Sequence, residues 1–229
     1  MTQNHKGGTM RSVIFDLDGT LADTSGDLIA AANSCFRALG LGDLLDPVSD
    51  AAIAFGGGRA MLREGFARTG SHGADEIDRQ YPILLAAYDK DIDVHTTLYP
   101  RAMESVAALK AAGYAVGICT NKPEGLARTL LTRLGILDQF ASLIGADTLP
   151  VRKPDPEPLF EAARRAGGNP AQCCLIGDTI TDRHTARAAG VPCVLVTFGP
   201  TGMDVANLKP EGLIGHFDEL HGVVQSLIG

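Results

Sequence analysis

The chain has 229 residues, 45% of them hydrophobic and 21% charged, with a formal net charge of −7. This length can bury a large core in one domain, or in one domain that carries a sizeable insertion. The acidic balance argues against nucleic acid or an anionic membrane as partner, and no apolar run approaches membrane-spanning length. The five cysteines form no CxxC pair or Cys/His cluster, a pattern that suits a reducing cytoplasm.

The patterned part of the chain opens with a short apolar run at residues 13–15, which predicts a strand buried on both faces of a parallel sheet. Asp16 and Asp18 follow at once, and Gly19 allows the backbone to turn away. Residues two apart on a strand share a face, so both carboxylates should project from the strand end in one direction. Because the two charges repel, we expect a hard divalent cation such as Mg²⁺ to neutralise them. An Asx-type turn that ends the strand is the alternative.

The next stretch is acidic and has a helical pattern. Apolar residues recur at helical spacing up to Leu39, and Gly40 stands where that helix would end. Three further helices are expected, at 47–54, 58–69 and 75–89. The stretch 24–95 contains 11 acidic and 6 basic residues and so carries −5 of the net −7. This pattern predicts a separate small helical domain at 24–95, inserted between the α/β stretches 10–23 and 96–229.

From Pro100 onward, strand and helix patterns alternate. Further strands are expected at 114–119, 140–145, 173–176 and 191–198. Pro123 is well placed for the first position, N1, of the helix after the first of these strands. The alternation implies a parallel sheet with right-handed crossovers, and hence an α/β, Rossmann-like core with helices on both faces.

Polar residues follow three of the expected strands: Asp16 and Asp18, then Thr120 and Asn121, then Asp178. In an open parallel sheet, binding sites lie beyond the carboxyl ends of the strands. Carboxylates, a hydroxyl and an amide that converge there would form a site for a metal ion and an oxyanion. Taken singly, each pair has a simpler explanation, since Thr-Asn before a helix commonly caps it and acidic residues at a helix start stabilise its dipole.

The sequence DLDGTLAD at residues 16–23 resembles the first signature of the haloacid dehalogenase-like hydrolase superfamily. Three further motifs of that superfamily follow in order: Thr120-Asn121, Lys153 before a proline, and GDTITD at 177–182. The resemblance implies that 24–95 is an α-helical cap domain that closes over the active site. It also implies that Asp16 is the nucleophile and Asp18 the general acid/base.

The same resemblance implies the remaining residues of the site. The phosphoryl group would be bound by Thr120, Asn121 and Lys153. The cofactor, Mg²⁺, would be held by a carboxylate oxygen of Asp16, the backbone carbonyl of Asp18, and Asp178. Asp182 would act from outside this ligand set, where it would orient either a metal-bound water or Lys153.

The resemblance also narrows the reaction. Superfamily members that cleave carbon–halogen or carbon–phosphorus bonds generally lack an aspartate at the position of Asp18, so phosphate ester hydrolysis is favoured. The run TNKP at 120–123 and the run FGGGR at 55–59 resemble those of phosphoglycolate phosphatases. The amides of Gly57 and Gly58 could approach a bound anion, and Arg59 could pair with a substrate carboxylate. A helix start with a solvated arginine is the alternative for this run.

We therefore expect a Mg²⁺-dependent phosphatase that hydrolyses a small phosphorylated metabolite through an aspartyl-phosphate intermediate, with 2-phosphoglycolate as the best guess. The alternatives are a phosphosugar mutase similar to beta-phosphoglucomutase, and a phosphatase for pyrophosphate, a nucleotide or a sugar phosphate. A non-catalytic binding module is disfavoured, because every catalytic position is filled. The expected form is a cytoplasmic monomer or homodimer without nucleic-acid or membrane partners.

Overall fold

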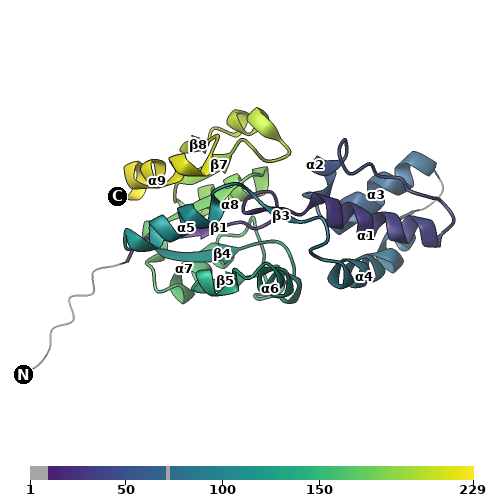
Figure 1. Ribbon diagram of the computed structural model, residues 1–229, viewed down its shortest axis with the longest axis horizontal. Coiled ribbons are helices and arrows are strands. Elements are labelled where there is room, and N and C mark those ends of the chain that lie inside the picture. The colour runs from purple at the N-terminus through teal and green to yellow at the C-terminus, as the bar shows by residue number, and fades with distance from the viewer. Residues whose placement is uncertain (1–9, 71–72) are drawn as a thin grey trace, which may run out of the picture.

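A six-stranded parallel sheet organises the chain, in the order β5-β4-β1-β6-β7-β8 (Figure 1). The computed structural model describes residues 10–70 and 73–229. The strands are β1 (Ser12–Phe15), β4 (Ala115–Cys119), β5 (Ser142–Ile144), β6 (Cys173–Gly177), β7 (Cys193–Val196) and β8 (Gly212–Ile214). This arrangement confirms the predicted α/β, Rossmann-like class.

The central strand β1 is buried on both faces, as its continuous apolar run predicts. Val13 and Phe15 point into one hydrophobic cluster, while Ile14 points into a second cluster on the opposite face. All three side chains have no exposed surface. Because alternate residues of a strand face opposite sides, a strand covered on both sides favours apolar residues at successive positions.

Helices cover both faces of the sheet. On the face of Val13 and Phe15 lie α5 (Ala102–Ala111), α6 (Glu124–Arg133) and α9 (Leu220–Ile228). On the face of Ile14 lie α7 (Glu157–Arg165) and α8 (Ile180–Ala189). The prediction for Pro123 was off by one position, because this residue is the N-cap of α6 and has extended backbone. Among the described residues, no helix is long and apolar enough to cross a membrane.

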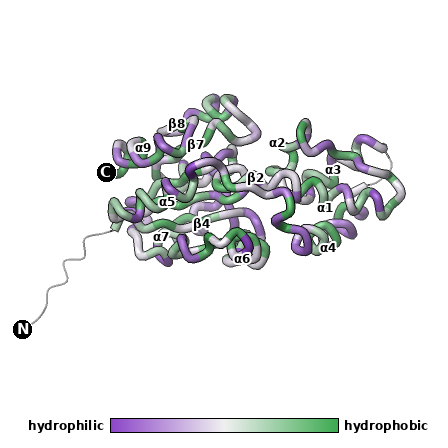
Figure 2. The backbone as a smooth tube through the Cα atoms, viewed as in Figure 1, coloured by the Kyte–Doolittle hydropathy of each residue, from purple (hydrophilic) through white to green (hydrophobic). Residues whose placement is uncertain are grey.

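Four helices between β1 and α5 lie to one side of the sheet and form what we call the helical segment, residues 24–95 (Figure 1). They are α1 (Ser25–Ala38), α2 (Ala51–Ala54), α3 (Gly58–Thr69) and α4 (Ala74–Lys90). The helix expected at 47–54 is shorter than the pattern suggested, since only its last turn is α-helical. Figure 2 shows apolar stretches both in this segment and around the sheet, and buried side chains from both belong to one hydrophobic cluster.

A short antiparallel ribbon joins the helical segment to the sheet. It consists of β2 (Ala22–Asp23) and β3 (Thr97–Leu98). Beside the ribbon, the buried carboxylate of Asp27 accepts hydrogen bonds from the amides of His95 and Thr96 and from Thr96 Oγ1, at 2.7–3.0 Å. The outgoing and returning chains are therefore bound to each other where they leave the sheet.

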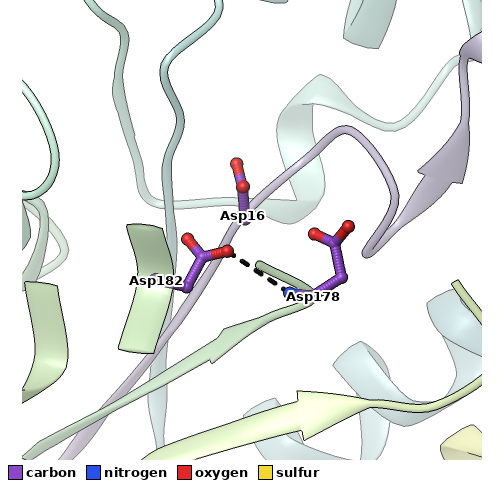
Figure 3. Close-up of side chains that lie close together, drawn as sticks. All are labelled: Asp16, Asp178 and Asp182. Atoms are coloured by element: carbon purple, nitrogen blue, oxygen red, sulfur yellow. Dashed lines mark hydrogen bonds between the residues drawn. The ribbon is translucent and has the colours of Figure 1, made fainter. Parts of the chain in front are cut away.

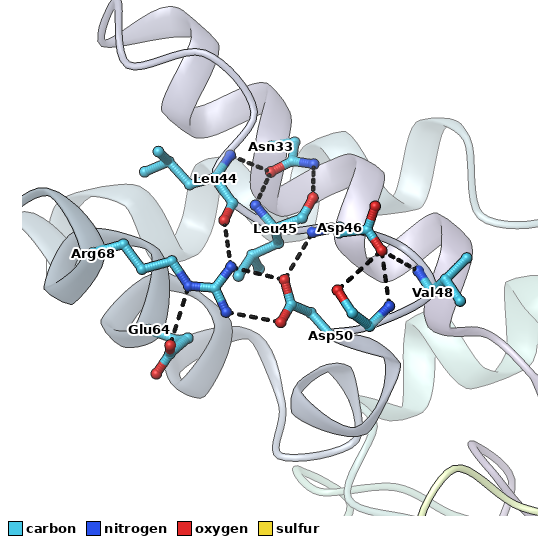
Figure 4. Close-up of polar contacts among 9 residues, drawn as sticks. Asn33, Leu44, Leu45, Asp46, Val48, Asp50, Glu64 and Arg68 are labelled. Atoms are coloured by element: carbon cyan, nitrogen blue, oxygen red, sulfur yellow. Dashed lines mark hydrogen bonds and ion pairs between the residues drawn. The ribbon is translucent and has the colours of Figure 1, made fainter.

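A polar cluster holds the loop between α1 and α2 against α3 (Figure 4). Asn33 accepts the amides of Leu44 and Leu45 at 3.1 Å and donates to the carbonyl of Leu45 at 2.8 Å. Arg68 binds both carboxylate oxygens of Asp50, at 2.7 and 2.8 Å. This two-point contact is the strong form of an ion pair, and it connects the start of α2 to the end of α3.

Candidate active site

A cavity of about 460 Å³ lies between the carboxyl ends of the central strands and the helical segment. Its wall on the sheet side includes Asp16, Asp18, Thr120, Asn121, Lys122 and Lys153. Its wall on the other side includes residues 54–59, Tyr81, Leu84 and Tyr88. Residues that lie more than a hundred positions apart in the sequence thus meet at the edge of the sheet where parallel strands end.

Asp16 is the first residue after β1. Its backbone amide donates to the carbonyl of Ile176 at 2.8 Å, which extends the pairing with β6. Its Oδ1 accepts the amide of Leu17 at 2.7 Å, and its Oδ2 lies 3.0 Å from Lys153 Nζ. Burial raises the pKa of Asp16 to about 7; Lys153 offsets only part of this, and the carboxylates of Asp182 and Asp18 add to the increase.

Lys153 lies between two carboxylates, with Nζ 2.6 Å from Asp182 Oδ1 and 3.0 Å from Asp16 Oδ2. Burial disfavours the ammonium charge, but Asp16 and Asp182 outweigh burial and raise the pKa of Lys153 above its usual value. Asp182 is held in turn by a capping box at the start of α8, where its Oδ2 accepts the backbone amide of Thr179 at 3.1 Å and its own amide donates to Thr179 Oγ1. The same Oδ2 also accepts a hydrogen bond from Thr179 Oγ1 at 2.6 Å. Of the two partners expected for Asp182, the structure shows Lys153.

Three carboxylates form a compact acidic cluster, because oxygen atoms of Asp16, Asp178 and Asp182 lie within 4.8 Å of one another (Figure 3). Lys153 is the cation in contact with two of them. Burial, followed by the charges of Asp182 and Asp16, raises the pKa of Asp178 well above its ordinary value. The cluster therefore has excess negative charge that a bound cation would neutralise.

Asp178 shows where such a cation fits. Its Oδ1 accepts a hydrogen bond from Thr20 Oγ1 at 2.9 Å, whereas its Oδ2 is buried and has no hydrogen-bond partner among the described residues. Gly19 passes so close that a Cβ there would lie 2.3 Å from this oxygen. Both oxygens of Asp182 are already engaged by protein donors. The free buried oxygen of Asp178, together with Asp16, suits a hard divalent cation.

Asp18 lies on the cavity wall with its side chain 17% exposed. Its Oδ1 accepts two hydrogen bonds at 2.7 Å, one from Thr24 Oγ1 and one from Lys122 Nζ. The lysine ammonium also lies over the ring of Tyr88, 4.5 Å from the ring centroid. Sequence reasoning singled out none of these three partners, although Lys122 stands inside the quoted TNKP run.

Thr120 and Asn121 follow β4. Thr120 is buried, and its Oγ1 accepts the amide of Lys122 at 3.1 Å. The side-chain amide of Asn121 donates to the backbone carbonyl of Lys153 at 3.0 Å. Asn121 thus connects the turn after β4 to the loop that carries the buried lysine.

Arg59, Gly57 and Gly58 line the cavity from the helical segment. The guanidinium of Arg59 is paired with Asp78 and lies 4.6 Å from the centroid of the Tyr81 ring. Half of its side-chain surface is exposed. The structure therefore brings Arg59 to the cavity wall, while its charge is already matched by a carboxylate of α4.

Comparisons with known proteins identify the family of this chain. A family model described as haloacid dehalogenase-like hydrolase matches residues 10–190. A phosphoglycolate phosphatase from Mesorhizobium japonicum is 39% identical over 209 residues, which cover 91% of this chain and 92% of that protein. Another from Rhodospirillum rubrum is 39% identical over 217 residues, with 91% and 87% covered. The crystal structure of a predicted phosphoglycolate phosphatase from Haemophilus somnus superposes with a TM-score of 0.83 at 26% identity, covering 94% of this chain and 98% of that one. The resemblance found in the motifs is thus confirmed, and the chain belongs to the haloacid dehalogenase-like hydrolase family.

Proposed function

We propose that this chain is a Mg²⁺-dependent phosphatase for a small phosphorylated metabolite, and that 2-phosphoglycolate is its substrate. The observation that carries the proposal is the pair Asp16 and Asp18 at the end of β1, beside the buried Lys153 and an oxygen of Asp178 that has no hydrogen-bond partner in residues 10–70 and 73–229. The relatives named phosphoglycolate phosphatase support the choice of substrate.

In this proposal, Asp16 attacks phosphorus and an aspartyl phosphate forms as the bond to the leaving oxygen breaks. Asp18 gives its proton to that leaving oxygen. Asp18 then takes a proton from water as the water attacks the same phosphorus, and Asp16 is released as a carboxylate. Since burial raises the pKa of Asp16 to about 7, the nucleophile needs Lys153 and a further positive charge to be fully ionised at neutral pH.

The residues that would hold Mg²⁺ are Asp16, Asp178 and the backbone carbonyl of Asp18. When bound, the ion would neutralise the acidic cluster and the charge on the phosphoryl oxygens. Asp182 stays outside this set because it holds Lys153 and caps α8. Thr120 would bind the phosphoryl oxygens through its hydroxyl and Lys153 through its ammonium. Asn121 would bind them as part of the turn after β4.

We further propose two domains, with the helical segment as a cap on a core formed by residues 10–23 and 96–229. Gly57, Gly58 and Arg59 would then face the organic part of the substrate, which leaves as the alcohol. We place the enzyme in the cytoplasm as a monomer or homodimer; its five free cysteines, all buried, are compatible with reducing conditions.

The test is phosphate release by the purified protein across a panel of phosphorylated metabolites, with Mg²⁺ and with EDTA. We expect Mg²⁺-dependent release, highest with 2-phosphoglycolate. Release from no member of the panel would contradict the phosphatase proposal. Release that is faster with pyrophosphate, a nucleotide or a sugar phosphate would contradict only the substrate. Transfer of phosphate within a hexose phosphate, without release, would instead indicate a mutase.

A further inference from the structure

Lys122 is a buried cation that the proposed reaction does not yet use. Its side chain is 4% exposed, although a lysine after a strand ordinarily extends into solvent. Thr120 Oγ1 accepts its backbone amide, so the turn after β4 is fixed. From there the side chain reaches across to the end of β1, where Nζ lies 2.7 Å from Asp18 Oδ1.

The contacts of Asp18 are one-sided. The donors Thr24 and Lys122 both bind Oδ1, and Oδ2 has no hydrogen bond within the part of the chain that the structure describes. Two donors on one oxygen determine the rotation of the carboxyl group about its Cβ–Cγ bond. Oδ2 is thereby left as the oxygen that can give a proton to a leaving group and take one from water.

The helical segment takes part in this arrangement through Tyr88 of α4. The ring of Tyr88 lies beneath the ammonium of Lys122, and both groups are almost completely removed from solvent. An ammonium in such a place is stable only while the carboxylate and the aromatic face replace its water. The position of Lys122 therefore depends on the helical segment lying against the strand ends.

We infer that Lys122 is a positioning residue for the acid/base carboxylate: with Thr24 it binds Oδ1 of Asp18, so that Oδ2 carries the proton to and from the reacting oxygen atoms. This inference rests on the proposed phosphatase function. The competing role for a cation in this cavity is to bind the carboxylate of the substrate. The two roles differ in which substrates are hydrolysed more slowly when the positive charge of Lys122 is removed.

The experiment compares wild type with Lys122→Met on three substrates. 2-Phosphoglycolate has a carboxylate and an alkoxide leaving group that needs a proton. 2-Hydroxyethyl phosphate has the same kind of leaving group without the carboxylate. 4-Nitrophenyl phosphate has a leaving group that is stable without a proton. The parameter is kcat/KM, since it reports the first chemical step, and Lys110→Met, at an exposed position on α5, is the matched control.

We expect Lys122→Met to lower kcat/KM for both alkyl substrates by similar factors, at most the roughly 10²–10⁴-fold that general acid catalysis supplies. For 4-nitrophenyl phosphate, kcat/KM should stay near the wild-type value. A rapid burst of nitrophenolate should nevertheless appear, because hydrolysis of the aspartyl phosphate still needs Asp18 as a base. Lys122→Arg, which keeps a charged donor, should recover most of the activity.

A loss confined to 2-phosphoglycolate would overturn the inference and assign Lys122 to the substrate carboxylate. Equal losses on all three substrates would also overturn it, because they would mean a general structural role. Circular dichroism checks the fold, and Lys122→Gln replaces Lys122→Met if the latter does not fold. If the wild type hydrolysed none of the three substrates, the proposed function itself would fail, and with it this inference.

Discussion

Replacing Gly19 with alanine tests the geometry of the acidic cluster. Gly19 has a φ of +78°, and an added Cβ would lie 2.3 Å from Asp178 Oδ2 and 2.8 Å from Asp178 Cγ. No Cβ tolerates such distances, so the carboxyl group would have to turn away. Its hydrogen bond with Thr20, 2.9 Å long, would then be lost.

The expected cost has two parts. Holding an alanine at positive φ costs about 1–2 kcal/mol of unfolding free energy. Losing the hydrogen bond between Thr20 and Asp178 costs about 0.5–1.5 kcal/mol more, since the raised pKa of Asp178 rules out the larger value of a fully charged acceptor. Gly40 separates the two, because it has nearly the same φ, +76°, with no atom within 4 Å of an added Cβ. Gly40→Ala should therefore show only the first part, and Gly19→Ala both.

Urea unfolding in EDTA measures the two costs without metal. Gly19→Ala should also change the dependence of activity on Mg²⁺. Because the carboxyl group of Asp178 would rotate away from its position, a higher Mg²⁺ concentration should be needed for half-maximal phosphate release. Gly40→Ala should leave that concentration unchanged. Equal losses of stability in the two variants, with no change in Mg²⁺ dependence, would refute the placement of Asp178 Oδ2 against the turn at Gly19.

Three further substitutions test other parts of the molecule. Asp16→Asn should abolish phosphate release, by a factor on the order of 10⁴ or more, while circular dichroism stays unchanged; near-normal activity would exclude Asp16 as the nucleophile. Arg59→Ala should raise KM for 2-phosphoglycolate by roughly tenfold at most, because Arg59 is half exposed and already paired with Asp78, and should hardly affect 4-nitrophenyl phosphate. Equal losses on both substrates would mean that Arg59 shapes the helical segment. Asp50→Asn should cost about 1.5 kcal/mol at pH 7, a value at the low end because Arg68 is partly exposed. The hydrogen bond from Arg68 lowers the pKa of Asp50, so this stabilisation is present above about pH 4 and disappears as pH falls below it. A pH-independent difference in urea unfolding would contradict the ion-pair explanation.

The sequence was sufficient to predict five of the six strands of the sheet and the residues at their ends, because both depend on local patterns; β8, with only three residues, was missed. A continuous apolar run is typical of a strand covered on both faces, and Asp16 follows the run that became β1. The parallel sheet then implies that the ends of β1, β4 and β6 meet. Periodicity over a dozen residues likewise predicted α1 and α3 close to their observed bounds.

What escaped prediction depends on contacts between distant parts of the chain. The ribbon of β2 and β3 has two residues in each strand, too few for any alternation to appear. The contact between Lys122 and Asp18 joins residues 104 positions apart, and a lysine in a turn gives no sign that it is buried. The choice of Lys153 as the partner of Asp182 likewise required the position of α8, which no local pattern contains.

The contacts of Asp27 with His95 and Thr96 have a consequence for how the two parts of the chain can vary. Because the helical segment leaves and rejoins the sheet at one point, its covalent connection to the rest of the protein is that of a closed loop. The entropy of closing a loop grows slowly with its length, by about 0.6 kcal/mol for each doubling. Helices of different length and surface can therefore be accommodated at 24–95 at little cost in loop-closure entropy, provided that contacts such as Tyr88 with Lys122 and Asp93 with Arg133 are kept. Under the proposed function, in which the helical segment faces the substrate, substrate choice can then change through this loop while Asp16, Asp18 and Asp178 keep their positions.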